Sequence, residues 1–418
     1  MMERELLQDL FRAAVAAADP ATALAASLPE RPRGRTVVVG AGKAAAQMAQ
    51  AFERAWGAPV DGLVVTRYGH GASTARIEVV EADHPVPDEA GFLAARRMMA
   101  MVHGLGPDDL VVALISGGGS ALLPAPGPGL TLVDEQELTR ALLASGLPIG
   151  QMNRIRNELS AIKGGRLAAL AAPARTETLI ISDVPGDDPA LVASGPTVPL
   201  AASRAEVRHL VSLARLTLPP AAAALLASSD NLPPRPDDPR FARNAVRIIA
   251  SAAMSLDAAA ARATAGGLAA HVLSDAIEGE ARDIGLMHAA LAREVIRRNR
   301  PFARPALLLS GGETTVTVRG EGRGGRNSEF LLAFALAIDG VDGISALAAD
   351  TDGIDGSEDN AGALADGTSV ARTRAAGIDP RAALANNDAY SAFAAIGDLV
   401  TTGPTGTNVN DFRAILIR

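Results

Sequence analysis

Apolar and polar positions alternate between strand-like and helix-like patterns along the first half of the chain. Residues 36–56, TVVVGAGKAAAQMAQAFERAW, predict a buried strand, a glycine turn and a helix in succession. Further runs typical of strands lie at 62–69, 76–82, 110–116 and 178–184, and helical patterns lie at 88–102 and 134–145. This order predicts a largely parallel sheet covered by helices, with ligands at the carboxyl ends of its strands.

The second half of the chain repeats the alternation. Residues 228–240, SSDNLPPRPDDPR, are dense in proline and acid and predict a domain boundary. Strands are expected at 245–251, 268–275, 305–318 and 343–350, and helices near 254–265, 281–298 and 327–338. We therefore expect two α/β domains, 1–235 and 236–418, with the active site in the cleft between them.

Composition narrows the class of protein. The chain has 418 residues, no cysteine and a formal charge of −8, so disulfides, thiolate nucleophiles and Cys-based zinc sites are excluded. No basic block and no apolar run of membrane-spanning length occurs, which argues against nucleic acid or a membrane as partner. The first ten residues lack the pattern of a signal peptide. We expect a cytoplasmic enzyme with a small polar substrate, either a monomer or a homodimer.

Lysine is nearly absent from the chain. Of the 39 basic side chains, only Lys43 and Lys163 are lysine. Lys43 lies in VVVGAGKAA, where Gly40, Gly42 and Ala45 satisfy the loose dinucleotide-binding pattern G-x-G-x-x-A. A cation at the start of a helix opposes the helix dipole unless it shares a bound anion with the helix amides. We therefore predict that Lys43 binds a phosphate.

A second glycine turn follows the predicted strand at 110–116. It comprises Gly117, Gly118 and Gly119, flanked by Ser116 and Ser120. Its backbone N–H groups and two hydroxyls suit an anion, but it lacks the lysine of a Walker-type phosphate loop. Lys43 would supply the missing charge if the two turns meet at one edge of the sheet. A similar stretch, LLLSGGET at 307–314, predicts a further glycine turn that faces this one.

Acidic residues follow two of the predicted strands. They are Asp183, Asp187 and Asp188 in ISDVPGDDP, and Asp350, Asp352 and Asp355 in AADTDGIDG. Because Mg²⁺ often binds one or two carboxylates together with substrate phosphates, these loops predict a site for magnesium or manganese. The candidate ligands are Asp183, Asp188 and Asp352.

A glycine-rich stretch, GEGRGGRNSEF at 320–330, precedes a predicted helix. It places Arg323 and Arg326 in a loop that we expect to be flexible. A mobile arginine can stabilise the charge on a phosphoryl group during transfer. This pattern favours phosphoryl transfer.

Nine segments, spread over nearly the whole chain, resemble the class II glycerate 2-kinases, a family with a C-terminal MOFRL domain whose members are often named hydroxypyruvate reductases. In order they are VVVGAGKAA, DHPVPD, ISGGGSALLPAP, MNRIRNELSAIKGGRLA, ISDVPGDDPALVASGPT, LLSGGETTVTV, GGRNSEFLLAFAL, AADTDGIDG and TTGPTGTNVND. The resemblance implies ATP-dependent phosphorylation of D-glycerate at its 2-hydroxyl, which gives 2-phosphoglycerate and ADP. It also implies a Rossmann-like N-terminal domain, a smaller MOFRL domain, and Lys43 and Arg326 as catalytic residues.

Other residues of these segments are candidates for binding substrate or nucleotide. The full candidate set is Gly40, Gly42, Ser116, Gly117, Gly118, Gly119, Ser120, Arg156, Asp183, Asp188, Glu313, Asn327, Glu329 and Asn408. The substrate carboxylate needs a bidentate or amide-rich partner, for which Arg156 and the loop 402–408 are candidates.

The general base and the class of function stay open at this stage. Asp188 or Asp352 could accept the hydroxyl proton, whereas His84 precedes a proline and is expected to shape a turn. A hydroxypyruvate reductase using NADH or NADPH would account for the first glycine turn but not for the acidic loops or Arg326. A nucleotide-binding regulator would keep the glycine turns without needing catalytic residues.

Overall fold

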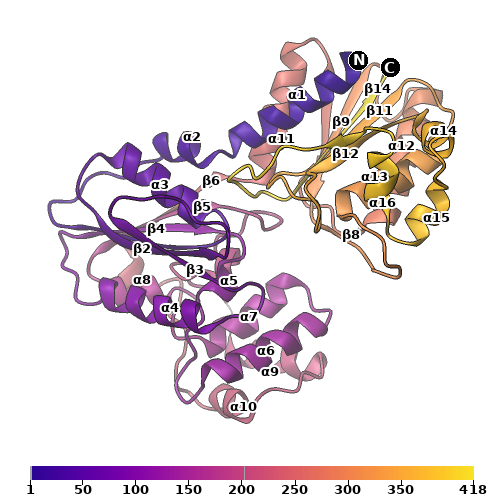
Figure 1. Cartoon of the computed structure of the whole chain (residues 1–418). Coiled ribbons are helices and arrows are strands. Elements are labelled where there is room, and N and C mark those ends of the chain that lie inside the picture. Colours follow the sequence, from indigo (N-terminus) through magenta and orange to yellow (C-terminus); the bar gives the residue numbers. More distant parts are fainter. Residues whose placement is uncertain (1, 202) are drawn as a thin grey trace. The chain divides into compact units, whose positions relative to one another are not determined.

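The structure of the chain is a computed structural model that describes residues 2–201 and 203–418 (Figure 1). The chain divides into two compact units. We call Pro20–Ile249 the N-terminal unit, and Ala250–Arg418 together with the residues up to Asp19 the C-terminal unit. Each unit is α/β, as expected. The division differs from the predicted domains 1–235 and 236–418, because the first helix packs in the C-terminal unit and residues 236–249 stay with the N-terminal one. No helix in the described ranges is long and apolar enough to cross a lipid bilayer.

The sheet of the N-terminal unit has the strand order β3-β2-β1-β4-β5-β6. The bounds are β1 (Thr36–Ala41), β2 (Asp61–Arg67), β3 (Ile77–Ala82), β4 (Leu110–Ser116), β5 (Arg175–Ile181) and β6 (Ala245–Ala250). From β3 to β5 each strand runs parallel to its neighbour. The direction of winding reverses between β1 and β4. In doubly wound sheets, the crevice at such a reversal is where ligands bind.

Helices cover both faces of this sheet. On one face, Val37, Val39 and Ala41 of β1 pack with α4 (Glu89–Val102) and α8 (Arg166–Ala171). The other face is covered by α3 (Ala45–Trp56), as Figure 1 shows. Burial on both faces explains why these strands read as continuous apolar runs in the sequence.

A helical cluster forms a second core in the N-terminal unit. It consists of α6 (Leu132–Ala144), α7 (Ile149–Leu159), α9 (Arg204–Leu213) and α10 (Pro220–Ala227). A buried ion pair joins two of these helices, because Arg204 Nε donates to Glu158 Oε2 at 2.8 Å. The second lysine is also structural: Lys163 Nζ is buried and donates to Leu123 O and to Glu135 Oε1, both at 2.9 Å. The short helices α2 (Pro20–Ala25) and α5 (Gly119–Leu122) and the 3₁₀ turns Val192–Ser194 and Pro239–Phe241 complete the unit.

The sheet of the C-terminal unit is mixed, with the order β13-β12-β11-β14-β9-β7. The bounds are β7 (Ala269–Ser274), β9 (Ala306–Gly312), β11 (Ile344–Asp350), β12 (Gly362–Asp366), β13 (Leu399–Val400) and β14 (Asp411–Ile417). β14 lies between β11 and β9 and is antiparallel to both, so β9 and β11 end at the same edge. A separate short ladder pairs β8 (Gly279–Glu280) with β10 (Thr314–Thr315).

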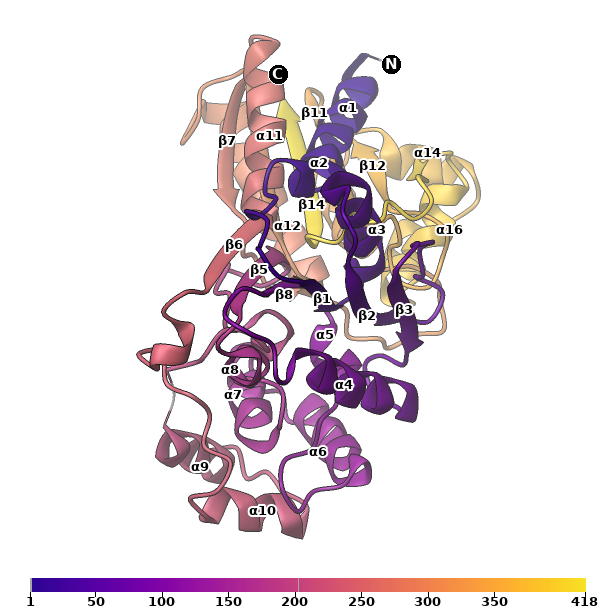
Figure 2. The same ribbon diagram turned by 90° about the vertical axis from the view of Figure 1, so that its left-hand side faces the viewer.

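Helices also cover both faces of the mixed sheet (Figure 2). On one face, α1 (Met2–Ala17) and α11 (Ala252–Ala265) form a shared core with β9, β11 and β14. On the other face lie α12 (Ala281–Arg298) and α13 (Arg326–Ala337), flanked by α14 (Ser369–Ala375), α15 (Pro380–Ala385) and α16 (Ala389–Ala394). The amphipathic first helix is therefore part of the C-terminal core.

Two features of this arrangement correct the sequence analysis. The apolar run 245–251 was predicted as a strand of the second domain, but β6 is the edge strand of the first sheet. Residues 305–318 were expected to form a strand, with a glycine turn within 307–314. No turn forms at the two glycines, because Ser310 to Gly312 pair with Arg413 to Asp411 of β14 and β9 continues through Gly312.

A buried histidine makes the stability of the C-terminal unit depend on pH. The ring of His288 lies 2.9 Å from Ile284 O and 3.0 Å from Ser310 Oγ, and burial lowers its pKa from 6.5 to about 4. Unfolded chains therefore bind this proton below pH 6.5, whereas the folded chain does so only near pH 4, and stability falls as the pH drops through that window. The difference in unfolding free energy between the native chain and His288→Gln should shrink from pH 6.5 to 4, as urea titrations can measure. A constant difference would contradict this assignment.

Candidate active site

The two glycine turns of the N-terminal unit meet where the sheet reverses its winding. Lys43 follows β1 and Gly117 follows β4, and the Lys43 amide donates to Gly117 O at 2.8 Å. The next amide, that of Ala44, donates to Ser116 Oγ at 3.0 Å. The carbonyl of Lys43 in turn accepts from Thr66 Oγ1 at 3.2 Å. These contacts fix the backbone of Lys43 against the second turn, as the sequence analysis required.

The first turn has no amide left for a phosphate. Gly42 N donates to Val65 O at 3.1 Å and Ala45 N to Gly42 O at 3.1 Å, in addition to the bonds of Lys43 and Ala44. The amides from Gly42 to Ala45 are therefore not free for a phosphate, and the phosphate-binding role of Lys43 stays a prediction. Gly40 has a packing role, since a Cβ there would overlap Leu114 O of the neighbouring strand.

The second turn, unlike the first, has backbone amides without an acceptor among the described residues. In the part of the chain that the structure describes, no acceptor bonds the amides of Gly118 and Gly119. Close packing requires glycine here, because a Cβ on Gly117 would overlap the Asp183 carboxylate and one on Gly119 would overlap Ala193. Ser120 Oγ contacts Ser194 Oγ, and Ser116 Oγ is occupied by Ala44 N. The free donors of this turn are thus backbone amides.

Two side chains flank Gly118 of the second turn, and the charges of two arginines act on one of them, His84. The four side chains are those of Lys43, His84, Arg67 and Arg156. Over the described ranges, neither the Lys43 ammonium nor the Arg67 guanidinium has a hydrogen-bond acceptor or an acidic partner, and Arg156 bonds only the amide oxygen of Asn153, at 3.1 Å. Burial and the charges of Lys43, Arg67 and Arg156 lower the pKa of His84 from 6.5 to about 4. Unpaired cations beside free amides are suited to binding an anion. We call these four side chains and the amides of Gly118 and Gly119 the anion site.

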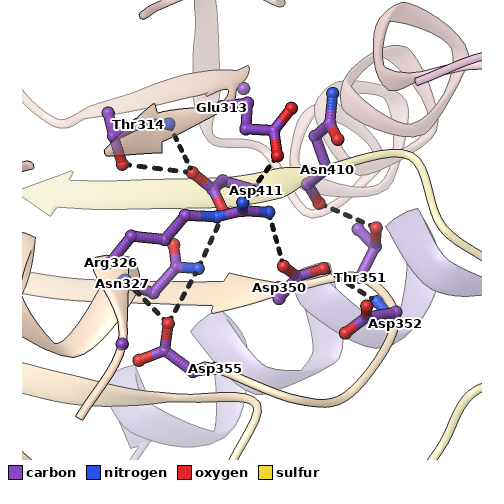
Figure 3. A network of polar contacts seen from close by, with 12 residues as sticks. Glu313, Thr314, Arg326, Asn327, Asp350, Thr351, Asp352, Asp355, Asn410 and Asp411 are labelled. Atoms are coloured by element: carbon purple, nitrogen blue, oxygen red, sulfur yellow. Dashed lines mark hydrogen bonds and ion pairs between the residues drawn. The ribbon is translucent and has the colours of Figure 1, made fainter. Parts of the chain in front are cut away.

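A second polar centre lies in the C-terminal unit around Arg326, the first residue of α13 (Figure 3). Its Nε donates to Asp411 at 2.7 Å, its Nη1 to Glu313 at 2.8 Å and its Nη2 to Asp350 at 2.6 Å. Burial alone would lower the pKa of Arg326, but the attraction of these carboxylates outweighs it and raises the pKa. The expected mobility of Arg326 is therefore wrong, because three acids hold its guanidinium.

The sheet brings these acids together. Asp350 ends β11 and lies opposite Asp411 at the start of β14, which in turn lies opposite Gly312 at the end of β9. Glu313 follows directly. Asp411 also accepts from Arg413 Nη2 at 2.5 Å and from Asn327 Nδ2 at 2.8 Å. Attraction to the two arginines overcomes the effect of burial and lowers the pKa of Asp411.

Asp411 and Arg413 were missed in the sequence analysis. The sequence could have indicated this pair, because residues i and i+2 of a strand share a face and a buried charge needs an opposite charge beside it.

Asp355 holds the start of α13: its carboxylate accepts from the amides of Asn327 and Ser328 at 2.9 and 2.8 Å and so caps the helix. Burial raises the pKa of Asp355.

Other predicted binding residues have partners that explain their positions. Glu329 is buried and accepts from Arg282 Nε and from Asn387 Nδ2, both at 2.9 Å. Asn408 accepts from Asn410 N at 3.1 Å within its loop. Asp352 accepts from Ile354 N at 2.9 Å, and Asp188 from Ala190 N at 3.0 Å. A ligand role for these residues remains a prediction.

Comparisons with known proteins agree over the whole chain. Residues 6–227 match a domain of unknown function, DUF4147, and residues 306–411 match the MOFRL family. The chain is 38% identical to the D-glycerate 2-kinase of Thermotoga maritima, over 98% of this chain and 97% of that protein. The crystal structure of the glycerate kinase from the same organism has a TM-score of 0.90 at 36% identity, covering 100% of both chains. The chain belongs to the glycerate kinase family.

A relative from Agrobacterium vitis is 54% identical over 99% of this chain and 94% of its own length, and it is named as a provisional hydroxypyruvate reductase. Both names thus occur in the glycerate kinase family, as the resemblance implied. The family implies ATP as co-substrate.

Kinases commonly use a divalent metal on ATP, and the site residues can be tested for it. The described ranges contain no group of three or more His, Asp or Glu side chains that could hold a metal ion. The carboxylates nearest Arg326 are bonded to it, whereas Asp183 lies directly against Gly117 of the anion site. Asp183 therefore stays a predicted ligand for a metal bound to phosphates at this turn.

Proposed function

We propose that this chain transfers the γ-phosphoryl group of ATP to the 2-hydroxyl of D-glycerate, which gives 2-phosphoglycerate and ADP. The observation that carries the proposal is the unpaired ammonium of Lys43 beside the free amides of Gly118 and Gly119. A cation without an acid partner is costly to half-bury unless a ligand supplies the negative charge. The relatives named glycerate kinases support the identity of the substrate.

The anion site divides naturally between the two substrates. Lys43 and the glycine amides would bind phosphoryl oxygens, because a compact ammonium and fixed N–H groups stabilise charge that develops during transfer. Arg156 or Arg67 would hold the glycerate carboxylate as a planar fork. A magnesium ion on the phosphates, next to Asp183, would neutralise further charge.

We propose that Arg326 still takes part in this reaction, and that only one nitrogen of its guanidinium can exchange its partner. Nε and Nη2 are bonded to the buried Asp411 and Asp350, whereas Nη1 bonds Glu313, whose side chain is 51% exposed. We infer that a substrate anion exchanges with Glu313 while the other two bonds hold the guanidinium in place. The freed Nη1 group would then stabilise charge on the phosphoryl group during transfer.

We also propose a Rossmann-like fold for the nucleotide-binding domain. The strand order supports a Rossmann-like N-terminal domain that binds the nucleotide at its carboxyl edge. A cytoplasmic location, a monomer or homodimer, and magnesium or manganese as the metal are proposed with it.

A hydroxypyruvate reductase is the second candidate, because close relatives carry that name. It would need the first glycine turn to bind the pyrophosphate of a dinucleotide through its amides. The amides from Gly42 to Ala45 are bonded within the protein, and β2 ends in Arg67 rather than in an acid for the adenine ribose. The geometry therefore favours the kinase.

One paired assay separates the two functions. The purified chain is incubated with D-glycerate, ATP and Mg²⁺, and separately with hydroxypyruvate and NADH or NADPH. We expect ADP and 2-phosphoglycerate in the first mixture, and no loss of 340 nm absorbance in the second.

Metal dependence is tested in the same kinase assay. Because kinases commonly use a divalent cation on the ATP phosphates, excess EDTA should stop turnover and added Mg²⁺ or Mn²⁺ should restore it. Full activity after chelation would remove the metal from the proposal.

A further inference from the structure

The side chain of His84 occupies an unusual position in the anion site. His84 lies in the segment between β3 and α4, and its ring reaches the second glycine turn. A Cβ built on Gly118 would stand 3.2 Å from His84 Nε2 and 3.3 Å from Lys43 Cγ. The imidazole and the lysine therefore flank the same residue. The sequence analysis expected only a turn-forming role for this histidine.

The ring nitrogens of His84 are not used by the protein. Its backbone amide bonds Asp83 Oδ1 at 2.8 Å, but over the described ranges no donor or acceptor meets the ring, although the side chain is half-buried. Buried histidines with a structural role usually bond at least one ring nitrogen, as His288 does. A ring left unpaired beside free amides and a lysine points to a ligand.

Burial, and after it the charges around His84, lower the pKa of the imidazole and keep the ring neutral. Lys43 follows β1, Arg67 ends β2 and Arg156 lies on α7, and each opposes protonation. Only Asp83, in the histidine's own loop, favours it, and that effect is the smallest. With a pKa of about 4, the free protein at pH 7 presents an imidazole with one unprotonated nitrogen. Such a nitrogen accepts a proton or a hydrogen bond.

We propose that His84 is the general base that removes the proton from the 2-hydroxyl of glycerate, an inference that rests on the proposed kinase function. The hydroxyl oxygen forms a bond to the γ-phosphorus as the bond from that phosphorus to the β,γ-bridging oxygen breaks. ADP leaves with the electron pair of the broken bond, and the hydroxyl proton moves to the free nitrogen of His84. The imidazolium then returns the proton to water after product release.

Substrate binding should make His84 a stronger base. ATP and glycerate carry several negative charges, and they would bind against the same cations that now oppose protonation. Burial still lowers the pKa in the complex, but neutralising those cations removes the second cause and raises the pKa of the imidazole above its value in the free protein, which makes the ring a stronger base. The free protein and the complex should therefore differ in the pKa of His84.

The first test compares His84→Gln with His103→Gln. Glutamine keeps hydrogen-bonding groups but cannot take up a proton, and His103 is an exposed residue at the end of α4. We expect kcat of His84→Gln to fall about 10²- to 10³-fold. KM for ATP should change by less than about threefold, and His103→Gln should match the native chain. Full kcat in His84→Gln, or a loss confined to KM, would overturn the proposal.

The pH dependence separates a base from a residue that only packs. For the native chain, kcat should decline on the acid side as His84 becomes protonated in the complex, and this decline should be absent from the residual activity of His84→Gln. The same acid limb in both proteins would assign it to another group and contradict the proposal.

A second measurement does not depend on turnover or on the variant being active. NMR titration of ring-labelled histidine, with His84→Gln identifying the signal, should give a pKa near 4 in the free protein. The pKa should rise by at least about one unit with Mg²⁺ and the β,γ-methylene analogue of ATP. An unchanged pKa contradicts the proposal for His84 alone. A native chain that phosphorylates no glycerate would instead overturn the kinase function, and the proposal with it.

Discussion

Arg326→Ala should destabilise the C-terminal unit by about 3–5 kcal/mol and remove kinase activity at the same time. The guanidinium bonds Asp350 and Asp411, which are both buried, so its loss leaves two carboxylates with less compensation inside the protein. Arg413 still contacts Asp411, but it is itself fully buried and cannot move to Asp350 without leaving its own partners. Urea unfolding followed by circular dichroism would measure the loss.

Arg323→Ala is the matched control. Arg323 lies three residues earlier, is exposed, and contacts the Tyr390 ring and Glu358 rather than the buried acids. We expect a change of less than about 0.5 kcal/mol for this variant, as is usual for surface positions. Equal stabilities for Arg326→Ala and the native chain would show that the network contributes little, and Arg326 would then be a free catalytic arginine after all.

Lys43→Ala should reduce kcat/KM by about 10³-fold or more while leaving the unfolding free energy nearly unchanged. The ammonium has no partner in the described protein, so removing it breaks no internal bond, whereas it would leave the bound phosphate without its nearest cation. Lys43→Arg should also lose most of the activity, because the wider guanidinium displaces the phosphate from an in-line position. Kinase assays and thermal unfolding of both variants measure the two effects.

The other lysine gives the opposite pattern and serves as a comparison. Lys163 is buried and bonds Leu123 O and Glu135, so Lys163→Ala should lower the unfolding free energy by about 2–3 kcal/mol.

Near-normal turnover in Lys43→Arg would mean that only the charge of Lys43 matters. Activity that survives in Lys43→Ala would remove Lys43 from the catalytic residues.

The centre of the N-terminal sheet was predictable from sequence because β1, β2, β4 and β5 are buried on both faces. Continuous apolar runs such as 110–116 mark β4 without ambiguity, and glycine turns mark the carboxyl ends of β1 and β4. The edge strand β6 was assigned to the wrong unit, since an apolar run shows that a strand exists but not which sheet receives it. β12 and β14 were missed. The β12 sequence GALAD consists mostly of small residues with little apolar alternation, and the β14 sequence FRAILI follows the loop 402–408, which was interpreted only as a binding motif.

Part of the site was predictable, because some of its residues have a distinctive local sequence. Local chemistry pointed to Lys43 and to the glycines 117–119, which the structure places in contact. Which amides are already bonded depends on the neighbouring strands, so the sequence could not show that the first turn is occupied and the second is free. His84 was discounted for the same cause: its neighbour in the sequence is a proline, whereas its neighbours in space are Gly118 and Lys43.

The restraint of Arg326 also follows from long-range pairing. Asp350 ends β11, Asp411 begins β14 and Glu313 directly follows β9, and only the antiparallel register of β14 with β9 and β11 brings the three acids to one guanidinium (Figure 3). A glycine-rich stretch before a helix suggested mobility, but the buried acids outweigh that local signal.

A crystal structure of the chain with D-glycerate, Mg²⁺ and the β,γ-methylene analogue of ATP tests the central claim most directly. We expect phosphoryl oxygens about 3 Å from Lys43 Nζ and from the amides of Gly118 and Gly119, with the first glycine turn still bonded to its own protein acceptors. Phosphates bound to the amides of Gly42 and Lys43, or held away from both turns, would contradict the account.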